Sequence, residues 1–185
     1  MKVIFLDIDG VLNGHNWVNL FIGNVCCKIK PLKVLWDKWD LFGIRSRYVR
    51  NLAKIVHATN AKIVISSSWK HAWYTPYLNC EKRMKSLKDK FTIYDIDVIG
   101  TTPTCEGSRR EDEIRKWLNQ TDYTVENYVI LDDEPSDLQS FIGNHLVKTS
   151  SIQDNEIIQG LPRENTGLTM RRARKAIQIL NKKGC

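Results

Sequence analysis

Short apolar segments that each end in a cluster of polar residues constrain the fold of this chain most strongly. The segments Lys2–Asp7, Ala61–Ser66 and Asn127–Asp132 are rich in valine, isoleucine and leucine and too short for buried helices, which predicts buried strands. Between them, Ser46–Ala58 and Arg109–Asn119 carry apolar residues at helical spacing. Strands that alternate with helices predict an α/β fold, with a mostly parallel sheet and helices on both of its faces.

The rest of the chain adds weaker elements to this order. Glu81–Lys90 is a candidate helix, Thr92–Ile99 a candidate strand and Leu146–Lys148 a further short strand. Thr169 can cap a final helix that extends through Leu180 and has one apolar stripe.

The polar clusters at the ends of the three strongest predicted strands define a candidate site. They are Asp7-Ile8-Asp9-Gly10, Ser66-Ser67-Ser68 and Asp132-Asp133, with Asp137 a few residues further on. The carboxyl ends of parallel strands meet at one edge of the sheet, and binding sites in such folds lie beyond that edge. Asp7 and Asp9 are two residues apart where a strand ends, so both can face one site while Gly10 allows a sharp turn.

The number of carboxylates at this edge predicts a bound cation. Several ionised carboxylates cannot share one pocket unless a positive charge neutralises them. Oxygen ligands without histidine favour a hard ion, and Mg²⁺ is the usual ion in phosphate chemistry. A carboxylate beside it can attack phosphorus and form an acyl phosphate, which divides one difficult displacement into two easier steps. An ordinary strand-to-turn transition explains Asp-Ile-Asp-Gly alone, but not the polar clusters at the other strand ends.

Charge and composition limit the compartment and the partner. The first apolar run meets Asp7 after four residues, too short for a signal peptide, and no stretch approaches the length of a membrane span. The five cysteines form no Cys-x-x-Cys pair, which disfavours a zinc site and agrees with reduced thiols. We therefore expect a cytoplasmic protein without membrane contact. The net charge of +7 favours an anionic partner such as phosphate, nucleotide or nucleic acid.

Three segments carry a resemblance to a known family. Phe5–Asn13 (Phe-Leu-Asp-Ile-Asp-Gly-Val-Leu-Asn) resembles the first motif of the haloacid dehalogenase-like (HAD) phosphatases. Ile65–Lys70 and Gly167–Thr169 resemble the HAD domains of the Swiss Army Knife RNA-repair group. The motifs extend over nearly the whole chain. The resemblance implies a Rossmann-like HAD fold with a minimal cap, acting as a magnesium-dependent phosphatase.

The resemblance also implies a role for each matching residue. Asp7 would be the nucleophile and a magnesium ligand, and Asp9 would protonate the leaving group and later activate water. Ser66 would donate a hydrogen bond to the transferring phosphoryl group. The expected catalytic residues are Asp7, Asp9, Ser66 and Arg110; the expected substrate-binding residues are Gly10, Ser67, Arg109 and Lys70; the expected metal ligands are Asp7, Asp9 (through its carbonyl), Asp132, Asp133 and Asp137, the last in support.

Two assignments stay open at this point. Either Asp132 or Asp133 can be the direct metal ligand of the fourth motif. The third motif needs a cation for the phosphoryl oxygens and the nucleophile. Arg110 is the first choice, followed by Arg109 and then Lys70. Two arginines at a helix start oppose the helix dipole, which favours a role beyond capping, although solvated charge is the alternative.

Asp9 further distinguishes the reaction type. Haloacid dehalogenases proper lack this second aspartate because halide leaves unprotonated, whereas the alkoxide of a phosphate ester benefits from a proton. The chain contains no Gly-x-x-x-x-Gly-Lys-[Ser/Thr] loop, so we expect no P-loop kinase within this sequence.

The chain of 185 residues fits a single domain, residues 1–185, with insertions at about 14–43 and about 70–90. The first lies where the superfamily inserts lids over the site, and at this length it makes only a small one. Both insertions mix aromatic and basic residues: Trp17, Phe21, Lys28, Lys30, Lys33, Trp36 and Trp39 in the first, and Trp73, Tyr74 and Tyr77 followed by lysines in the second. Such a mixture suits stacking on bases and contact with phosphates, but packing within a lid explains the aromatic residues equally well.

A small lid leaves the site open to large substrates. Together with the basic charge and the resemblance, this favours phosphorylated ends of DNA or RNA as the substrate. A nucleotide or small-metabolite phosphatase is the alternative enzyme. A HAD-fold module that binds nucleic acid or protein without turnover is the alternative from another class.

Overall fold

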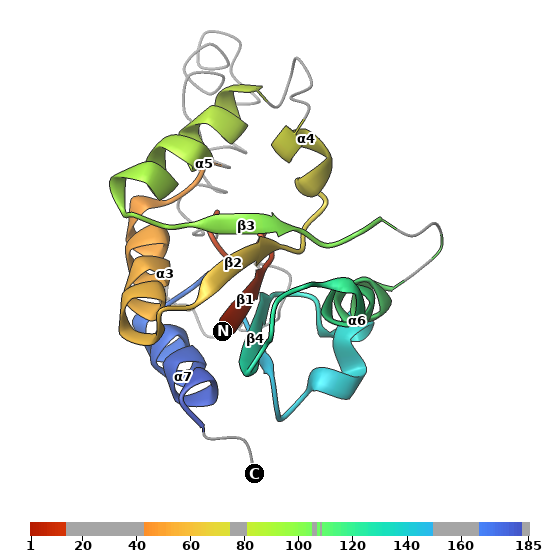
Figure 1. The fold of residues 1–185 in the computed structure, drawn as a ribbon. Helices are drawn as coiled ribbons and strands as arrows, with labels where there is room; N and C mark the ends of the chain where they lie inside the picture. The colour runs from red at the N-terminus through yellow and green to blue at the C-terminus, as the bar shows by residue number, and fades with distance from the viewer. Residues whose placement is uncertain (14–42, 75–80, 105–106, 108, 150–166, 183–185) are drawn as a thin grey trace, which may run out of the picture.

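A computed structural model of the chain describes residues 1–13, 43–74, 81–104, 107, 109–149 and 167–182. Its centre is a sheet of five parallel strands in the order β3-β2-β1-β4-β5 (Figure 1). The strands are β1 (Lys2–Leu6), β2 (Lys62–Ile65), β3 (Val98–Thr101), β4 (Asn127–Asp132) and β5 (Leu146–Lys148). The helices are α3 (Ser46–Thr59), α4 (Lys70–Tyr74), α5 (Glu81–Ile93), α6 (Arg110–Gln120) and α7 (Met170–Leu180), with a 3₁₀ segment η1 (Pro135–Phe141).

This arrangement confirms the predicted Rossmann-like α/β fold. Except for one strand, the predicted strands and the helices α3, α6 and α7 have their ends within one residue of the expected positions. The candidate helix at Glu81–Lys90 extends three residues further, to Ile93. None of the described helices is long and apolar enough to cross a membrane.

Both faces of the sheet are buried, each against its own set of helices. Ile4 and Leu6 of β1 face the core formed with α3, α5 and α7, whereas Val3 and Phe5 face the core formed with α6 and η1. On the second face, Phe5 meets Trp117 of α6 edge to face, with the ring centroids 5.4 Å apart. Burial on both faces explains why the strands are continuous apolar runs and do not alternate with polar residues.

The strand predicted at Thr92–Ile99 was wrong. The helix α5 continues through Thr92 and Ile93, a turn follows with Asp95 at φ 52°, and the strand β3 begins only at Val98. Phe91 is buried in the core, and its carbonyl accepts a hydrogen bond from the backbone of Ile96 at 2.9 Å. Packing of Phe91 therefore extends the helix and outweighs the strand propensity of Thr92 and Ile93, the β-branched residues that follow it.

The two expected insertions are only partly described. Of the segment 14–43, residues 14–42 lie outside the described residues, and so do residues 75–80 of the segment 70–90. The described part of the second segment is helical and consists of α4 and most of α5, which contact each other. Trp73 of α4 packs on Phe91 of α5, with the ring centroids 6.2 Å apart.

The loop after β1 is tied to the beginnings of two helices. The backbone N–H of Arg45, just before α3, donates to the carbonyl of Leu12 at 2.9 Å. The backbone N–H of Leu168, just before α7, donates to the carbonyl of Val11 at 2.8 Å. As predicted, Thr169 caps α7, its side-chain oxygen accepting from the N–H of Arg172 at 3.4 Å. Both helices thus start at the same edge of the sheet, beside the end of β1.

Gly167 allows the close approach that makes this connection. It adopts φ +70°, and a Cβ atom at this position would lie 2.6 Å from Cε2 of Tyr48 on α3. Asn51 of α3 also donates from its side chain to the carbonyl of Leu168 at 2.9 Å. The Gly-Leu-Thr segment therefore joins α7 to α3 and to the loop after β1.

We expect Gly167→Ala to destabilise the folded state by about 2–4 kcal/mol, because it combines an unfavourable φ with a clash against a buried ring. Gly143→Ala is the matched control, since Gly143 has φ +87° but no atom within 4 Å of the added Cβ. Its expected loss is about 1–2 kcal/mol. Urea unfolding of both variants measures the difference. Equal losses would show that the contact with Tyr48 places no constraint on residue 167.

Candidate active site

The register of the sheet brings the polar strand ends to one level. Leu6 at the end of β1 pairs with Ile65 of β2 on one side and with Leu131 of β4 on the other. One step further, the N–H of Asp7 donates to the carbonyl of Leu131 at 2.9 Å, and the N–H of Ser66 donates to that of Leu6 at 2.8 Å. The residues that follow the three strands therefore lie side by side at the carboxyl edge, as expected for this fold.

Three carboxylates meet at this edge. Oxygen atoms of Asp7, Asp132 and Asp133 all lie within 4.8 Å of one another. Asp7 and Asp132 are only 5% and 2% exposed, although such groups are almost never buried without compensation. The N–H of Glu134 donates to Asp132 Oδ1 at 2.9 Å and orients that side chain.

The electrostatics of the cluster favour protonation or a bound cation. Burial, followed by the charge of Asp7, raises the pKa of Asp132 to about 7. The same two causes raise the pKa of Asp133 to about 6. Burial also raises the pKa of Asp7, against the lowering effects of Arg110 and of a hydrogen bond from Ser67. The cluster in its fully ionised form is thus unfavourable without added positive charge.

Arg110 supplies part of that charge. Its Nη1 lies 2.9 Å from Asp7 Oδ1 and 3.1 Å from Asp132 Oδ2, and it donates to the carbonyl of Ser66. Burial lowers the pKa of Arg110, but the charges of Asp132 and Asp7 outweigh this and raise it. One guanidinium group therefore joins the ends of β1, β2 and β4.

The other two candidates for the third-motif cation lie differently. Lys70 is buried, with Nζ 2.7 Å from Glu113 Oε1 of α6, and it donates to the carbonyl of Pro103 at 3.2 Å. Arg109 is exposed at the start of α6, where its backbone N–H donates to the carboxylate of Asp112 at 3.1 Å. Of the three, Arg110 alone contacts the carboxylate cluster in the described part of the chain. The geometry supports the first choice, and its catalytic role stays a prediction.

The serines after β2 occupy two different positions. Ser67 forms a hydrogen bond to the carboxylate of Asp7 that lowers the pKa of that group. The hydroxyl of Ser66 is buried, and no hydrogen-bond partner is found for it among the described residues. Ser66 thus retains a donor at the carboxyl edge, which fits its expected contact with a phosphoryl group, whereas the bond from Ser67 to Asp7 was not expected.

Asp9 is held outside the buried cluster by two side chains to which the sequence assigned no role. Trp69 donates from Nε1 to Asp9 Oδ2 at 2.9 Å, and Asn13 donates from its amide to Asp9 Oδ1. The N–H of Gly10 in turn donates to Asn13 Oδ1 at 2.8 Å. Both partners stand inside the motifs, Asn13 four residues after Asp9 and Trp69 directly after the serines, but only the fold brings them together.

Gly10 and Asp137 complete the set of expected residues. Gly10 has φ +67°, and a Cβ at this position would lie 2.1 Å from Asp133 Oδ2, so no larger residue fits without movement. Asp137 is exposed on η1 and does not belong to the group of three close carboxylates. Its expected part in support of the metal stays a prediction.

The donor set fits a hard divalent cation. The side chains of Asp7, Asp132 and Asp133 offer oxygen atoms only, with no histidine or cysteine in the group. Oxygen-only sites of this kind suit Mg²⁺, while zinc favours nitrogen and sulfur ligands. Mg²⁺ bound there would neutralise the carboxylates and draw electron density from a phosphoryl oxygen.

The comparison with known protein families agrees with the fold. The model of the family described as "HAD domain in Swiss Army Knife RNA repair proteins" matches residues 3–154. This range includes the three polar strand ends and, apart from Lys2, all five strands, and it stops before α7. Neither the curated proteins nor the solved structures yielded a match.

The raised pKa of Asp133 predicts a stabilising substitution. Its value of about 6 lies above the ordinary 3.8, so ionised Asp133 destabilises the folded state above pH 6. We expect Asp133→Asn to raise the free energy of unfolding by about 1–2 kcal/mol near pH 8 without divalent cations. The gain should shrink as the pH falls through about 6 and vanish near 4. Urea unfolding in the presence of a chelator measures it.

The control is Asp97→Asn, which removes an exposed carboxylate 2.8 Å from Lys62 Nζ. In this variant the free energy of unfolding should fall by at most about 1 kcal/mol near pH 8. A gain for Asp133→Asn that does not depend on pH would contradict the electrostatic origin.

Proposed function

Because the chain belongs to the family of HAD domains in Swiss Army Knife RNA repair proteins, we propose that it is a magnesium-dependent phosphatase that acts on phosphorylated ends of nucleic acids. Membership of the family indicates a phosphatase-type hydrolase. The observation that carries the proposal is the buried cluster of Asp7, Asp132 and Asp133 joined by Arg110. Structural ion pairs do not require three close carboxylates, whereas nucleophilic attack on a phosphate ester in the presence of a divalent cation does use them.

Asp7 is the nucleophile in this proposal. Its carboxylate is oriented by Arg110 and Ser67, and one of its oxygen atoms attacks phosphorus. A bond forms between this oxygen and phosphorus while the bond from phosphorus to the ester oxygen breaks. Arg110 and the hydroxyl of Ser66 then stabilise the charge on the phosphoryl oxygens during transfer.

Asp9 is the general acid and base. It gives a proton to the departing ester oxygen, and in the second step it takes a proton from the water that attacks the phosphorus of the aspartyl phosphate. This water releases inorganic phosphate and restores Asp7. The hydrogen bonds from Trp69 and Asn13 keep the Asp9 carboxylate in one orientation beside the site.

The substrate class rests on charge and on the family. The chain has a net charge of +7, and the family is described by its place in RNA repair proteins. Such a charge increases the binding affinity for a polyanion more than that for a single phosphate, because each phosphate contact releases counterions. We therefore place phosphorylated nucleic-acid ends ahead of nucleotides and small metabolites.

A phosphate-release assay tests the proposal with three substrates: a terminally phosphorylated oligonucleotide, the matching mononucleotide and a sugar phosphate. We expect wild-type protein with Mg²⁺ to act with the highest kcat/KM on the oligonucleotide. Asp7→Asn should lower kcat about 1,000-fold or more, because a carboxamide is a poor nucleophile. Chelation should abolish turnover and Mg²⁺ restore it, whereas Ca²⁺ should not, since its longer and more variable bonds misplace the reacting groups.

Three outcomes would contradict the proposal at different points. Full activity of Asp7→Asn would exclude the covalent mechanism. Turnover that survives complete chelation would exclude the metal. A mononucleotide that exceeds the oligonucleotide in kcat/KM at low and at high salt would leave a metabolite phosphatase in its place.

The contact between Trp69 and Asp9 predicts a dependence on the leaving group. Trp69→Phe keeps an aromatic ring but removes the N–H that donates to Asp9. We expect kcat for an alkyl phosphate to fall at least about 10-fold, because a hydrogen bond to a charged group contributes about 1.5–3 kcal/mol. The loss for nitrophenyl phosphate should be smaller, since its acidic leaving group needs little protonation.

Trp73→Phe is the matched control, because Trp73 packs on Phe91 and lies under Lys88. It should affect the two esters equally and weakly. If Trp69→Phe also lowers both rates by the same factor, Trp69 supports the packing of the site and not the orientation of the acid.

A further inference from the structure

The positive charge of the chain is concentrated on two neighbouring helices. The basic residues are Arg47, Arg50 and Lys54 on α3, and Arg171, Arg172, Arg174 and Lys175 on α7. Neither helix contains an aspartate or a glutamate. Without these seven, the chain has 21 basic residues left of its 28, as many as its 21 acidic residues. The whole net charge of +7 is therefore accounted for by α3 and α7.

These two helices lie side by side and in contact on one face of the sheet (Figure 1). Arg50 and Lys54 are exposed on α3, and Arg171, Arg174 and Lys175 are exposed on α7. Arg50 and Lys54 are four positions apart, and Arg174 and Lys175 follow Arg171 by three and four positions, so each set lies on one side of its helix. The opposite sides, with Leu52 and Ala173 among others, are buried in the core. The exposed sides of these two adjoining helices are therefore both basic, and together we call them the α3–α7 face.

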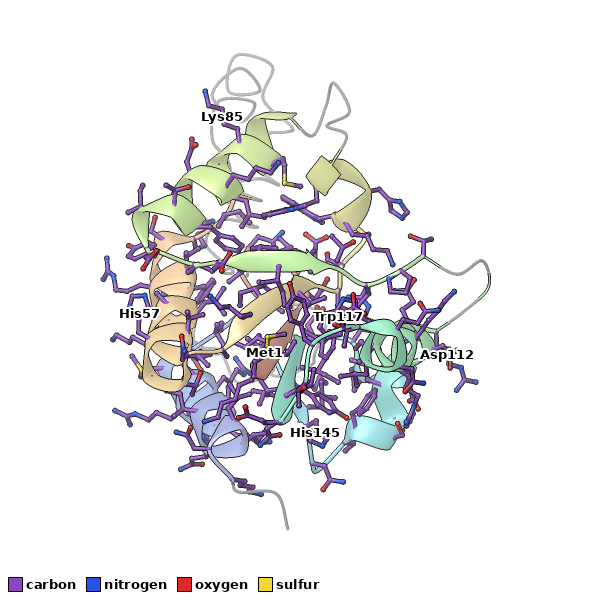
Figure 2. The ribbon with its side chains drawn as sticks, in the orientation of Figure 1. Met1, His57, Lys85, Asp112, Trp117 and His145 are labelled. Atoms are coloured by element: carbon purple, nitrogen blue, oxygen red, sulfur yellow. The ribbon has the colours of Figure 1, made fainter. Side chains whose placement is uncertain are left out.

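The acidic residues at the start of α6 lie away from the α3–α7 face. The first turn of α6 contains Glu111, Asp112 and Glu113, on the other side of the sheet. Figure 2 shows Asp112 and His57, the latter on α3, at opposite margins of the molecule. Among the described residues, no carboxylate pairs with Arg50, Lys54 or Arg174. The charges of these three residues are thus not neutralised by carboxylates in the described part of the protein.

The α3–α7 face begins at the active-site edge. Both helices start next to the loop that carries Asp7 and Asp9, through the hydrogen bonds from Arg45 and Leu168 to that loop. At these starts Arg47 donates to the hydroxyl of Tyr48 at 2.7 Å and Arg172 to the carbonyl of Gly167 at 2.9 Å, so both side chains are held in place. A helix of 14 residues extends about 21 Å, enough to face several successive phosphates.

We propose that the α3–α7 face binds the sugar–phosphate backbone of a nucleic acid whose phosphorylated end lies at Asp7. The inference rests on the proposed function for the position of that end, but the binding itself does not require turnover. Five of the seven basic residues are arginines, whose planar guanidinium groups suit phosphate oxygens.

A lipid surface is the other polyanion that such a face can meet. Helices that bind membranes also insert large apolar side chains. The exposed large apolar residues in the described part of the chain are Ile93, Tyr123 and Ile142, and none of them lies on α3 or α7. The composition of the face therefore favours a nucleic acid.

The test is a binding measurement with the full chain in a chelator, so that the probe stays intact. The probe is a fluorescent single-stranded RNA of about 20 nucleotides with a terminal phosphate, titrated from about 50 to about 200 mM salt. The variant is Arg50→Gln/Lys54→Gln/Arg174→Gln. The control, Lys62→Gln/Lys85→Gln/Lys116→Gln, lowers the net charge equally at positions outside α3 and α7.

We expect the α3–α7 variant to bind the RNA about 10-fold or more weakly near 50 mM salt. Its slope of log affinity against log salt should be smaller by about two, since each lost phosphate contact on a single strand removes about 0.7. The control should change affinity by no more than about 2-fold. Hydrolysis of nitrophenyl phosphate reports separately whether the carboxylate site is intact in each variant.

Equal binding and equal salt slopes for the variant and the control would overturn the inference. Binding to vesicles that contain phosphatidylserine, without binding to RNA, would overturn it in favour of a membrane. If the variant loses RNA affinity but wild-type protein hydrolyses no ester, the α3–α7 face stands and the proposed phosphatase function fails.

Discussion

Asp7 is buried beside Asp132 and Asp133, and the guanidinium group of Arg110 offsets much of the cost of placing these charges together. An uncompensated buried charge costs several kcal/mol, so the position of α6 and the chemistry of the site depend on each other. The ion pair of Lys70 and Glu113 also holds α6 in place, because it joins α4 to the first turn of α6. The ion pairs of Arg110 with Asp7 and Asp132, together with the ion pair of Lys70 and Glu113, thus fix the position of α6.

Most of the fold was predictable because burial on both faces leaves a simple signal. Continuous apolar runs marked β1, β2 and β4, and polar residues marked the points where these strands reach the edge. The prediction failed at β3, where Phe91 packs into the core and draws two β-branched residues into α5. Contacts of this kind join residues that are distant in sequence, so no local pattern reveals them.

The candidate site was predictable to the level of residue type and strand end. The parallel register follows from the fold, and it places Asp7, Ser66 and Asp132 at one level. The partners of each side chain were less predictable. A choice between Arg110 and Lys70 needs the direction in which α6 and α4 present their side chains, and the bond from Trp69 to Asp9 crosses 60 positions of the sequence.

The hydrogen bond from Arg45 to Leu12 has a consequence for how this fold can vary. It joins two backbone positions, so Leu12 and Arg45 are held together beside the carboxyl edge of the sheet. The free energy needed to close a loop between two such positions grows only with the logarithm of the loop length. The intervening segment can therefore be exchanged for a shorter or longer one while the spacing of β1 and α3 is kept. A change in the length of the chain between Leu12 and Arg45 therefore need not displace the carboxylate of Asp7.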